Sequence, residues 1–593
     1  MSSPMAPPTP PRLPTLPLTT PTKKTSRNIA VIGAGAAGLV AARELRREGH
    51  KVVIFERDFM LGGTWVFDPR VERDQLGLDP SRSVVHSSLY YSLRTNLPRE
   101  VMGFRDYPFV VVKGPGRDAR RFPGHREVLR YLCGFAEEFR AVGLIRFRTE
   151  VVRVGLVEGG KWEVKSRRRD GGDEDVVVDV NEVYDGVVVC NGHYTEPRAA
   201  EFPGIDMWPG VQIHSHNYRI PEPFRDQVVV VIGSSASAID ISRDIAGVAK
   251  EVHVASRSIT KETASEQLDN KNIWLHPMIE RALDDGTVIF GNESSADVDA
   301  ILHCTGYKYH FPFLETSNIV NVDDNCVGPL YQHIFPPLLA PWLSFVGLPW
   351  KVIPFPLFEL QSKWVAGVLS GRIQLPSQEE MMAKVEEFYL KLEAAGVPKR
   401  YTHNMSDYQF DYNDWLAGEC EFPASEEWRK QMYTATGKNR IARPETYRDE
   451  WEDQHLVLQA QEDFLHCSLH WFKDNILGME ASKEPEHVDG NFPDDLDQSM
   501  PSPQEEEQAL KKKYGGMVPK KPPLISKDHE RAFFDSADWA LGKQGGAPKP
   551  KGPLEALRPK LQPTQQHSRS RKSPYAPADG EDGGSPEDPN ASE

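Results

Sequence analysis

The sequence predicts an α/β protein with two Rossmann-like dinucleotide-binding domains, the second of them inserted into the first. Two glycine-rich turns about 200 residues apart indicate this fold, because each lies between an apolar strand pattern and a helix pattern. Such a turn offers backbone N–H groups and the positive end of a helix dipole to a pyrophosphate. Two turns in one chain suggest two dinucleotides held side by side for hydride transfer. The turn residues are Gly33, Ala34, Gly35, Ala36, Ala37 and Gly38 in the first, and Gly233, Ser234, Ser235, Ala236, Ser237 and Ala238 in the second.

The first turn is followed by every element that a dinucleotide site requires. A strand over 29–32 leads into it, and a helix over 39–45 and a strand over 51–55 follow. That second strand ends at Glu56, where an acid accepts a hydrogen bond from a ribose 2′-hydroxyl and rejects a 2′-phosphate. The alternative, a glycine-rich helix start without a ligand, does not explain this complete order.

A further glycine pair lies directly downstream of the first site. The pair, Gly62 and Gly63, is followed by Thr64 and Trp65, so flexible glycine precedes an aromatic ring. Alone this run is a plain loop. Beside the first turn it suits the edge of an isoalloxazine ring and favours FAD over NAD.

The second turn is followed by a different strand ending. The strand over 251–255 ends in Ser256, Arg257 and Ser258 instead of an acid. A guanidinium group and hydroxyls at the ribose suit a 2′-phosphate, which indicates NADPH. The alternative for Arg257 is an ordinary solvated surface charge.

Composition excludes several other classes. The chain has 593 residues, 39% of them hydrophobic, so several globular domains are expected. Its formal net charge of -16 argues against nucleic acid as the main partner. The six cysteines form no CxxC pair, so we expect no metal site and a reducing, cytoplasmic location. No apolar run approaches a membrane span.

Composition also divides the chain into segments. The leader has basic residues and no acid, so it is a disordered leader or, alternatively, an organelle transit peptide. The expected segments are a disordered leader (1–26), the first part of the FAD-binding domain (27–220), the NADP-binding domain (221–300), the second part of the FAD-binding domain with C-terminal helices (301–479), an acidic linker (480–507), a short mixed segment (508–545) and a disordered tail (546–593).

The chain from about 27 to 479 resembles the flavin-containing monooxygenases, and its plant branch in particular. The family signature reads Phe-x-Gly-x3-His-x3-Phe/Tyr, and here Trp208 stands for the Phe while Gly210, His214 and Tyr218 keep the register. Related Baeyer–Villiger enzymes have Trp at the position of Tyr218. Three further matches are Thr305 and Gly306 in a Thr-Gly-Tyr motif, and Asn96 in an active-site loop.

The resemblance implies a flavin-dependent monooxygenase that uses NADPH and O₂. Its C4a-hydroperoxyflavin would oxygenate a soft nucleophile, sulfur or nitrogen. The plant branch favours a thioether S-oxygenase acting on glucosinolate-like or methionine-derived substrates. The alternative is an N-hydroxylating enzyme of the auxin-forming kind. Disulfide reductases are disfavoured because the first cysteine, Cys133, lies far beyond the first turn.

Two residues of the resemblance have competing interpretations. Asn96 is the catalytic candidate, because its amide can donate a hydrogen bond to the flavin peroxide. Its alternative is a turn residue before Leu97 and Pro98. For His214 we expect a structural histidine that shapes the region between the nucleotide domains, in preference to direct catalysis.

The segment 508–545 resembles a second family, the endosulfines, which are disordered inhibitors of type-2A protein phosphatases. The family core Phe-Asp-Ser-Gly-Asp-Tyr corresponds to 534–539, with Ala537 for Gly and Trp539 for Tyr. By resemblance, a Greatwall-type kinase phosphorylates Ser536, and the phosphoserine then occupies the phosphatase site. Alternatives are a chance serine in an acidic-aromatic helix, two neighbouring genes joined in one sequence, and a chain whose regulated role is phosphatase inhibition.

Overall fold

The first dinucleotide unit is built on a five-stranded parallel sheet. The computed structural model describes residues 25–82, 87–170, 176–260, 263 and 272–465. The strand order is β21-β7-β1-β2-β3, with β1 paired to both β2 and β7. The bounds are β1 Asn28–Ile32, β2 Lys51–Phe55, β3 Ile145–Arg146, β7 Gly186–Val189 and β21 Leu343–Phe345. This sheet confirms the predicted first strand, turn and second strand.

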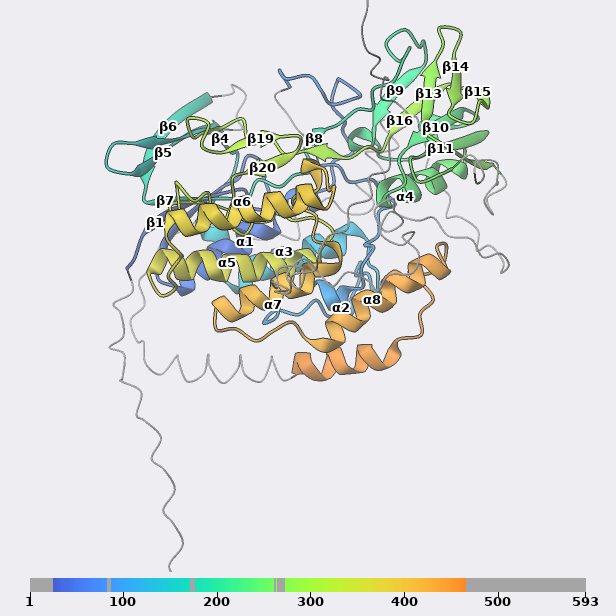
Figure 1. Cartoon of the computed structure of the whole chain (residues 1–593). Helices are drawn as coiled ribbons and strands as arrows, with labels where there is room; N and C mark the ends of the chain where they lie inside the picture. The colour runs from blue at the N-terminus through green and yellow to red at the C-terminus, as the bar shows by residue number, and fades with distance from the viewer. Residues whose placement is uncertain (1–24, 83–86, 171–175, 261–262, 264–271, 466–593) are drawn as a thin grey trace, which may run out of the picture. The chain divides into compact units, whose positions relative to one another are not determined.

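The second dinucleotide unit repeats this plan with another five-stranded parallel sheet, and its strands group with helix α4 in Figure 1. The order is β12-β11-β10-β16-β9. The bounds are β9 Val211–His214, β10 Val228–Ile232, β11 Glu251–Ala255, β12 Ile273–His276, β16 Ala300–His303 and α4 Ala236–Ala246. Two Rossmann-like units are therefore present, as the sequence predicts.

The second sheet takes strands from outside the expected segment 221–300. Strand β9 precedes that segment and pairs in parallel with β16, which ends just after it. Strand β9 was not identified from the sequence, because it is only four residues long and follows a loop rich in proline and glycine. The signature residue His214 therefore ends a strand of the second sheet.

Smaller sheets and helices surround the two units. The small strands are β4 Thr149–Val157, β5 Lys161–Asp170, β6 Val176–Tyr184 and β18 Leu314–Glu315 in one sheet, β13 Ile279–Ala282, β14 Thr287–Phe290 and β15 Ser295–Asp297 in another, and the pairs β8 Glu196–Pro197 with β17 Tyr307–Lys308 and β19 Asn321–Asp323 with β20 Cys326–Gly328. The helices besides α4 are α1 Ala36–Arg47, α2 Arg99–Met102, α3 His125–Glu138, α5 Pro354–Ser370, α6 Gln378–Ala394, α7 Gln409–Glu419 and α8 Glu427–Ala442. Residues 454–465 are helical as well.

Helix α1 lies in the middle of the main hydrophobic core. It packs against α5, and Figure 1 shows the two helices side by side. Arg43 of α1 is buried between Asp106 and Glu359, with N–O distances of 2.7 Å to each. A buried guanidinium group requires such partners, because a lone buried charge is strongly destabilising. This packing fixes the helix whose N-terminus faces the first turn.

Among the described residues, we find no helix with the length and apolar character that a bilayer crossing demands.

Candidate functional site

The first glycine turn is sterically specified. Gly33 has φ of +104°, and a Cβ atom there would lie 2.7 Å from the carbonyl oxygen of Cys190. A Cβ atom on Gly38 would lie 1.8 Å from the carbonyl oxygen of Gly33. Only glycine fits at both positions, so the strand, turn and helix approach one another as the fingerprint requires. The N-cap residue Gly35 makes no side-chain cap, and the first turn of α1 holds no acidic residue.

The predicted loop at 63–65 lies directly against this turn. It forms a short 3₁₀ helix, Gly63–Trp65. A Cβ atom on Gly63 would be 3.0 Å from the Cα atom of Gly35, so two bare backbones meet here. The structure thus brings Gly63 to the helix N-terminus, while Thr64 stays exposed, and the contact of this run with a flavin stays a prediction.

Glu56 is buried at the end of β2 and receives two backbone hydrogen bonds. Ala34 donates to Oε2 at 2.7 Å and Asp58 donates to Oε1 at 2.9 Å. Burial raises the pKa of this carboxyl although both hydrogen bonds oppose the shift. Each carboxylate oxygen has a second lone pair, so a ribose hydroxyl can still donate to it. The contact with the turn explains how the acid is held in place.

The second turn reproduces the first at its leading glycine. Gly233 has φ of +130°, and a Cβ atom would lie 2.6 Å from the carbonyl oxygen of Cys304. Ser235 is the N-cap of α4 and makes no side-chain cap, and the first turn of α4 has no acid. Ser258 donates from its hydroxyl to Ser234 at 3.2 Å, which brings the strand ending beside the turn.

Arg257 and Arg198 lie near one another at the end of β11. Arg257 is exposed, as a group that meets a soluble phosphate must be. Arg198 donates to the carbonyl oxygen of Thr305 at 2.9 Å, and burial, followed by the charge of Arg257, lowers its pKa. Two guanidinium groups close enough to repel favour an anion between them. Sequence reasoning missed Arg198, because no motif surrounds it.

The signature loop fixes the boundary between the units. His214 is fully buried, its Nδ1 accepts from the backbone of His216 at 3.0 Å, and its Nε2 donates to the Gly306 carbonyl at 3.1 Å. Burial lowers the pKa of His214 to about 3, so the ring is neutral at physiological pH. These contacts agree with a structural histidine. Tyr218 is also buried and donates to Asp244 of α4 at 2.6 Å. Gly210 lies against the indole of Trp208.

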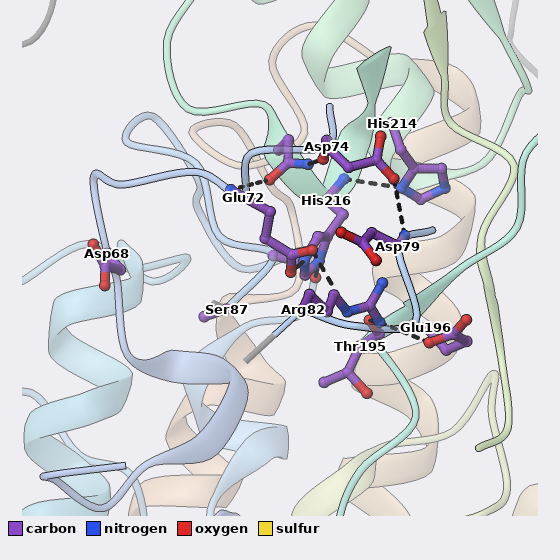
Figure 2. A network of polar contacts seen from close by, with 12 residues as sticks. Asp68, Glu72, Asp74, Asp79, Arg82, Ser87, Thr195, Glu196, His214 and His216 are labelled. Atoms are coloured by element: carbon purple, nitrogen blue, oxygen red, sulfur yellow. Dashed lines mark hydrogen bonds and ion pairs between the residues drawn. The ribbon is translucent and has the colours of Figure 1, made fainter. Parts of the chain in front are cut away.

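A polar network ties this loop to residues 68–82, 87 and 88, and Figure 2 shows Glu72 beside His216. His216 Nε2 lies 2.6 Å from Glu72 Oε1, and its Nδ1 lies 2.8 Å from the Ser88 hydroxyl. Arg219 is buried and donates to the Asp68 carbonyl at 2.6 Å. These contacts were not predicted from the sequence, because the partners lie more than 100 positions apart.

Asn96 lies on the loop that precedes α2. Its side chain is exposed, whereas the neighbouring Thr95 is buried. Thr95 receives support on both sides, donating from its amide to Pro123 at 2.9 Å and from its hydroxyl to Leu97 at 2.8 Å. The loop therefore presents the Asn96 amide from a fixed backbone, and its catalytic role stays a prediction.

The part of the chain that the structure describes contains no candidate metal-binding cluster. No group of three or more His, Cys, Asp or Glu side chains gathers there in a way that could hold a metal ion. The predicted phosphorylation site Ser536 and the whole segment 466–593 lie outside the described residues.

Comparison with known families decides the class. The model described as flavin-binding monooxygenase-like matches residues 26–270 and 270–421. The chain belongs to this family. It is a flavin-containing monooxygenase, and the two glycine turns lie within the matched residues.

Plant monooxygenases are similar over nearly their whole length. The Arabidopsis thaliana flavin-containing monooxygenase FMO GS-OX-like 4 is 62% identical over 444 residues, covering 74% of this chain and 97% of the relative. FMO GS-OX5 from the same plant is 58% identical over 446 residues, covering 75% and 96%. The solved structure of S-allyl-L-cysteine S-oxygenase from Allium sativum is 62% identical, with a TM-score of 0.72, and covers 75% of this chain and 100% of its own.

The C-terminal segment matches a different family. The model described as cAMP-regulated phosphoprotein/endosulfine conserved region matches residues 499–575. This range contains the predicted segment 508–545 and Ser536. The monooxygenase thus has an endosulfine-like segment downstream of its catalytic part.

Proposed function

We propose that this monooxygenase binds FAD at the first turn and NADPH at the second, and S-oxygenates a small thioether with O₂. The observation that carries the proposal is the different ending of two otherwise similar units, Glu56 in the first and Arg257 in the second. The 62% identity to S-allyl-L-cysteine S-oxygenase supports sulfur as the oxygenated atom. Relatives that act on sulfur favour this substrate class over the N-hydroxylating alternative.

The residues of both turns fit a pyrophosphate. Helices α1 and α4 each begin without a side-chain cap and without an acid in the first turn. Their N-termini therefore keep the positive dipole end available for an anion. Gly35 and Gly63 leave bare backbone where the first dinucleotide must approach. Glu56, held by the amides of Ala34 and Asp58, would accept from the ribose hydroxyl.

The chain's own contribution is binding, orientation and hydrogen bonding. Flavin, when bound and reduced by the nicotinamide, supplies the activation of dioxygen and the transfer of one oxygen atom. Asn96 would donate its amide hydrogens to the departing oxygen atom. The signature loop would hold the two nucleotide units in a fixed relative position. Buried His214 carries no charge, so it shapes this region instead of exchanging protons.

A direct experiment tests cofactors and substrate class together. Purified full-length chain should be yellow and should oxidise NADPH faster than NADH. With S-allyl-L-cysteine as the thioether probe, mass spectrometry should find a product heavier by one oxygen atom. An amine probe serves as the comparison, and a hydroxylated amine without any sulfoxide would overturn the sulfur assignment. Protein without flavin after reconstitution with FAD would overturn the cofactor assignment.

For the endosulfine-like segment we propose phosphorylation-dependent binding to a type-2A phosphatase, with a Greatwall-type kinase acting on Ser536, and a cytoplasmic location. The match to residues 499–575 supports this role. A phosphate adds about -1.5 to -2 charges, which an unmodified serine cannot imitate. Phosphorylated chain should inhibit the phosphatase, whereas Ser536→Ala treated with the same kinase should not. Equal inhibition by both would refute the role of Ser536.

A further inference from the structure

A segment after α8 runs back to the active-site loop and is firmly anchored. We call residues 443–453 the strap. Tyr447 is buried and packs edge-on against Phe122, with ring centroids 5.7 Å apart. Asp453 forms a bidentate ion pair with Arg121, at 2.5 and 2.9 Å. These anchors hold the strap at two points and restrict the residues between them.

Between the anchors, Arg448 bridges the strap to both nucleotide units. Its two terminal nitrogens donate to the Asp240 carboxylate on α4, at 3.0 and 2.6 Å. Its Nε donates to the carbonyl oxygen of Thr95 at 3.0 Å. Both side chains of the ion pair are only 16% exposed, so water screens the pair little. One guanidinium group thus joins the helix of the second turn to the residue before Asn96.

The loop over 90–96 has further contacts with the same helix. Tyr90 donates to Asp240 at 3.2 Å, and Ser92 donates to Asp244 at 2.8 Å. Arg448 is the contact closest in sequence to Asn96. It holds the loop backbone from the strap side through the Thr95 carbonyl, while the Thr95 amide donates to Pro123 at 2.9 Å on the other side. The strap also contacts the loop through Asp449, which pairs with Arg94 at 2.8 Å.

We propose that Arg448 is a positioning residue, which sets the place of the Asn96 amide relative to the NADP-binding helix α4. The proposal rests on the proposed function, because Asn96 matters only if this chain transfers oxygen there. Arg448 does not itself touch a reacting group.

The chemistry of the guanidinium group explains the choice of arginine. A bidentate grip on a carboxylate uses two terminal nitrogens and leaves the Nε–H to face a third acceptor. Burial opposes the charge, but Asp240, together with Tyr447 and Tyr90, raises the pKa of Arg448. Lysine would keep a charge facing Asp240 but lacks the planar fork. A displacement of about 1 Å at a catalytic group can reduce a rate by as much as 100-fold.

The test compares Arg448→Lys and Arg448→Ala with wild type in the full chain loaded with FAD. We expect product formation to fall at least tenfold in both variants, while flavin content and KM for NADPH change less than twofold. Hydrogen peroxide released per NADPH should rise correspondingly. If charge alone mattered, the lysine variant would recover wild-type coupling, and that result would overturn the positioning role.

A second readout does not depend on activity. Hydrogen–deuterium exchange of peptides covering 90–97 should be faster in both Arg448 variants than in wild type. Arg243→Ala is the matched control, because Arg243 is a second arginine between α4 and the strap, where it donates to the Pro444 carbonyl at 2.9 Å and pairs with Glu445 at 2.7 Å. The control should leave exchange at 90–97 and coupling unchanged.

The outcomes separate this inference from the proposed function. Wild type that forms no oxygenated product from any thioether or amine probe would refute the function. If exchange at 90–97 then still rises in the Arg448 variants, Arg448 orders the loop. Unchanged exchange in those variants, or an equal increase in Arg243→Ala, would overturn the inference about Arg448.

Discussion

The two dinucleotide units contain similar glycine turns, but the helix that follows the turn is buried more fully in the first unit than in the second. In each unit a leading glycine with positive φ lies against the carbonyl of a cysteine that ends a neighbouring strand, Gly33 against Cys190 and Gly233 against Cys304. The units differ at the end of the turn, where the first has Gly38 and the second has Ala238. The leading turn is therefore shared, while the packing of the following helix is not.

Burial of the two helices follows this difference. Ten consecutive residues of α1, from Ala36 to Leu45, are buried between the sheet and the core. In α4 only Ala238, Ile241, Ser242 and Ile245 are buried. An enclosed helix suits a cofactor that stays bound, and a more exposed one suits a co-substrate that must leave in every cycle. This difference is in line with the proposal that FAD binds the first unit and NADPH the second.

The broadest expected effect comes from exchanging the residues that end the two turns, because loss of flavin removes every later step of the reaction. In Gly38→Ala the new methyl group would lie 1.8 Å from the Gly33 carbonyl oxygen, so strand and helix must separate. Overpacking of this kind costs about 1–3 kcal/mol, and we expect flavin content to fall by at least tenfold. The flavin content is measured as flavin absorbance per mole of protein after dialysis.

The reciprocal exchange is the matched control for that measurement. Ala238→Gly removes a methyl group that the second unit already accommodates, so flavin content should stay as in wild type. Equal flavin loss in both variants would show that the two turns are packed alike, against the comparison.

A change in the loop that contacts α4 from the first unit should affect oxygenation alone and leave flavin content unchanged. Asn96→Ala should keep flavin and NADPH oxidation but lower oxygenation by roughly 100- to 1,000-fold, as removal of a single oxyanion donor does. Reduced flavin would then release hydrogen peroxide. Product and peroxide per NADPH are the measurements, and Asn321→Ala, an exposed asparagine of β19, is the control. Sulfoxide formation at the wild-type rate would exclude a catalytic role for Asn96.

Local features were predictable from the sequence, and distant contacts were not. The turns, Glu56 and the strand ending at Arg257 were found because each depends on backbone conformation and on residues nearby in the chain. The bridge from Arg448 to Thr95 spans 353 positions and carries no spacing pattern. The pair of Glu72 and His216 spans 144 positions and was not predicted for the same reason. Nothing local marks a residue whose partner is chosen by the tertiary fold.

The two sheets should also differ in their response to acid. None of the five strands of the first sheet contains a histidine, whereas the second sheet has His214, His253, His276 and His303. Burial lowers the pKa of all four, to about 3 for His214 and about 4 for His276 and His303. A depressed pKa stabilises the fold above the unfolded value of about 6.5, and this contribution is lost as pH falls toward the folded value.

His214→Gln tests this difference, since glutamine can still donate to the Gly306 carbonyl. Between pH 7 and pH 5, the free energy of unfolding should fall by about 2 kcal/mol more in wild type than in the variant. The reason is that pH 5 lies about 1.5 units below the unfolded pKa, and each unit contributes about 1.4 kcal/mol. Urea unfolding at both pH values measures the two losses. Identical losses would mean that His214 takes up its proton in the folded protein.

The smallest expected effect concerns the residue that distinguishes the two ribose sites. Arg257 is exposed, so its contact with a 2′-phosphate is partly screened, and Arg257→Ala should reduce the preference for NADPH over NADH by about tenfold. The ratio of kcat/KM for the two nucleotides measures this preference. Arg225→Ala removes another exposed arginine of the same unit and should leave the ratio unchanged. If Arg257→Ala also left the ratio unchanged, the assignment of Arg257 to the 2′-phosphate would be wrong.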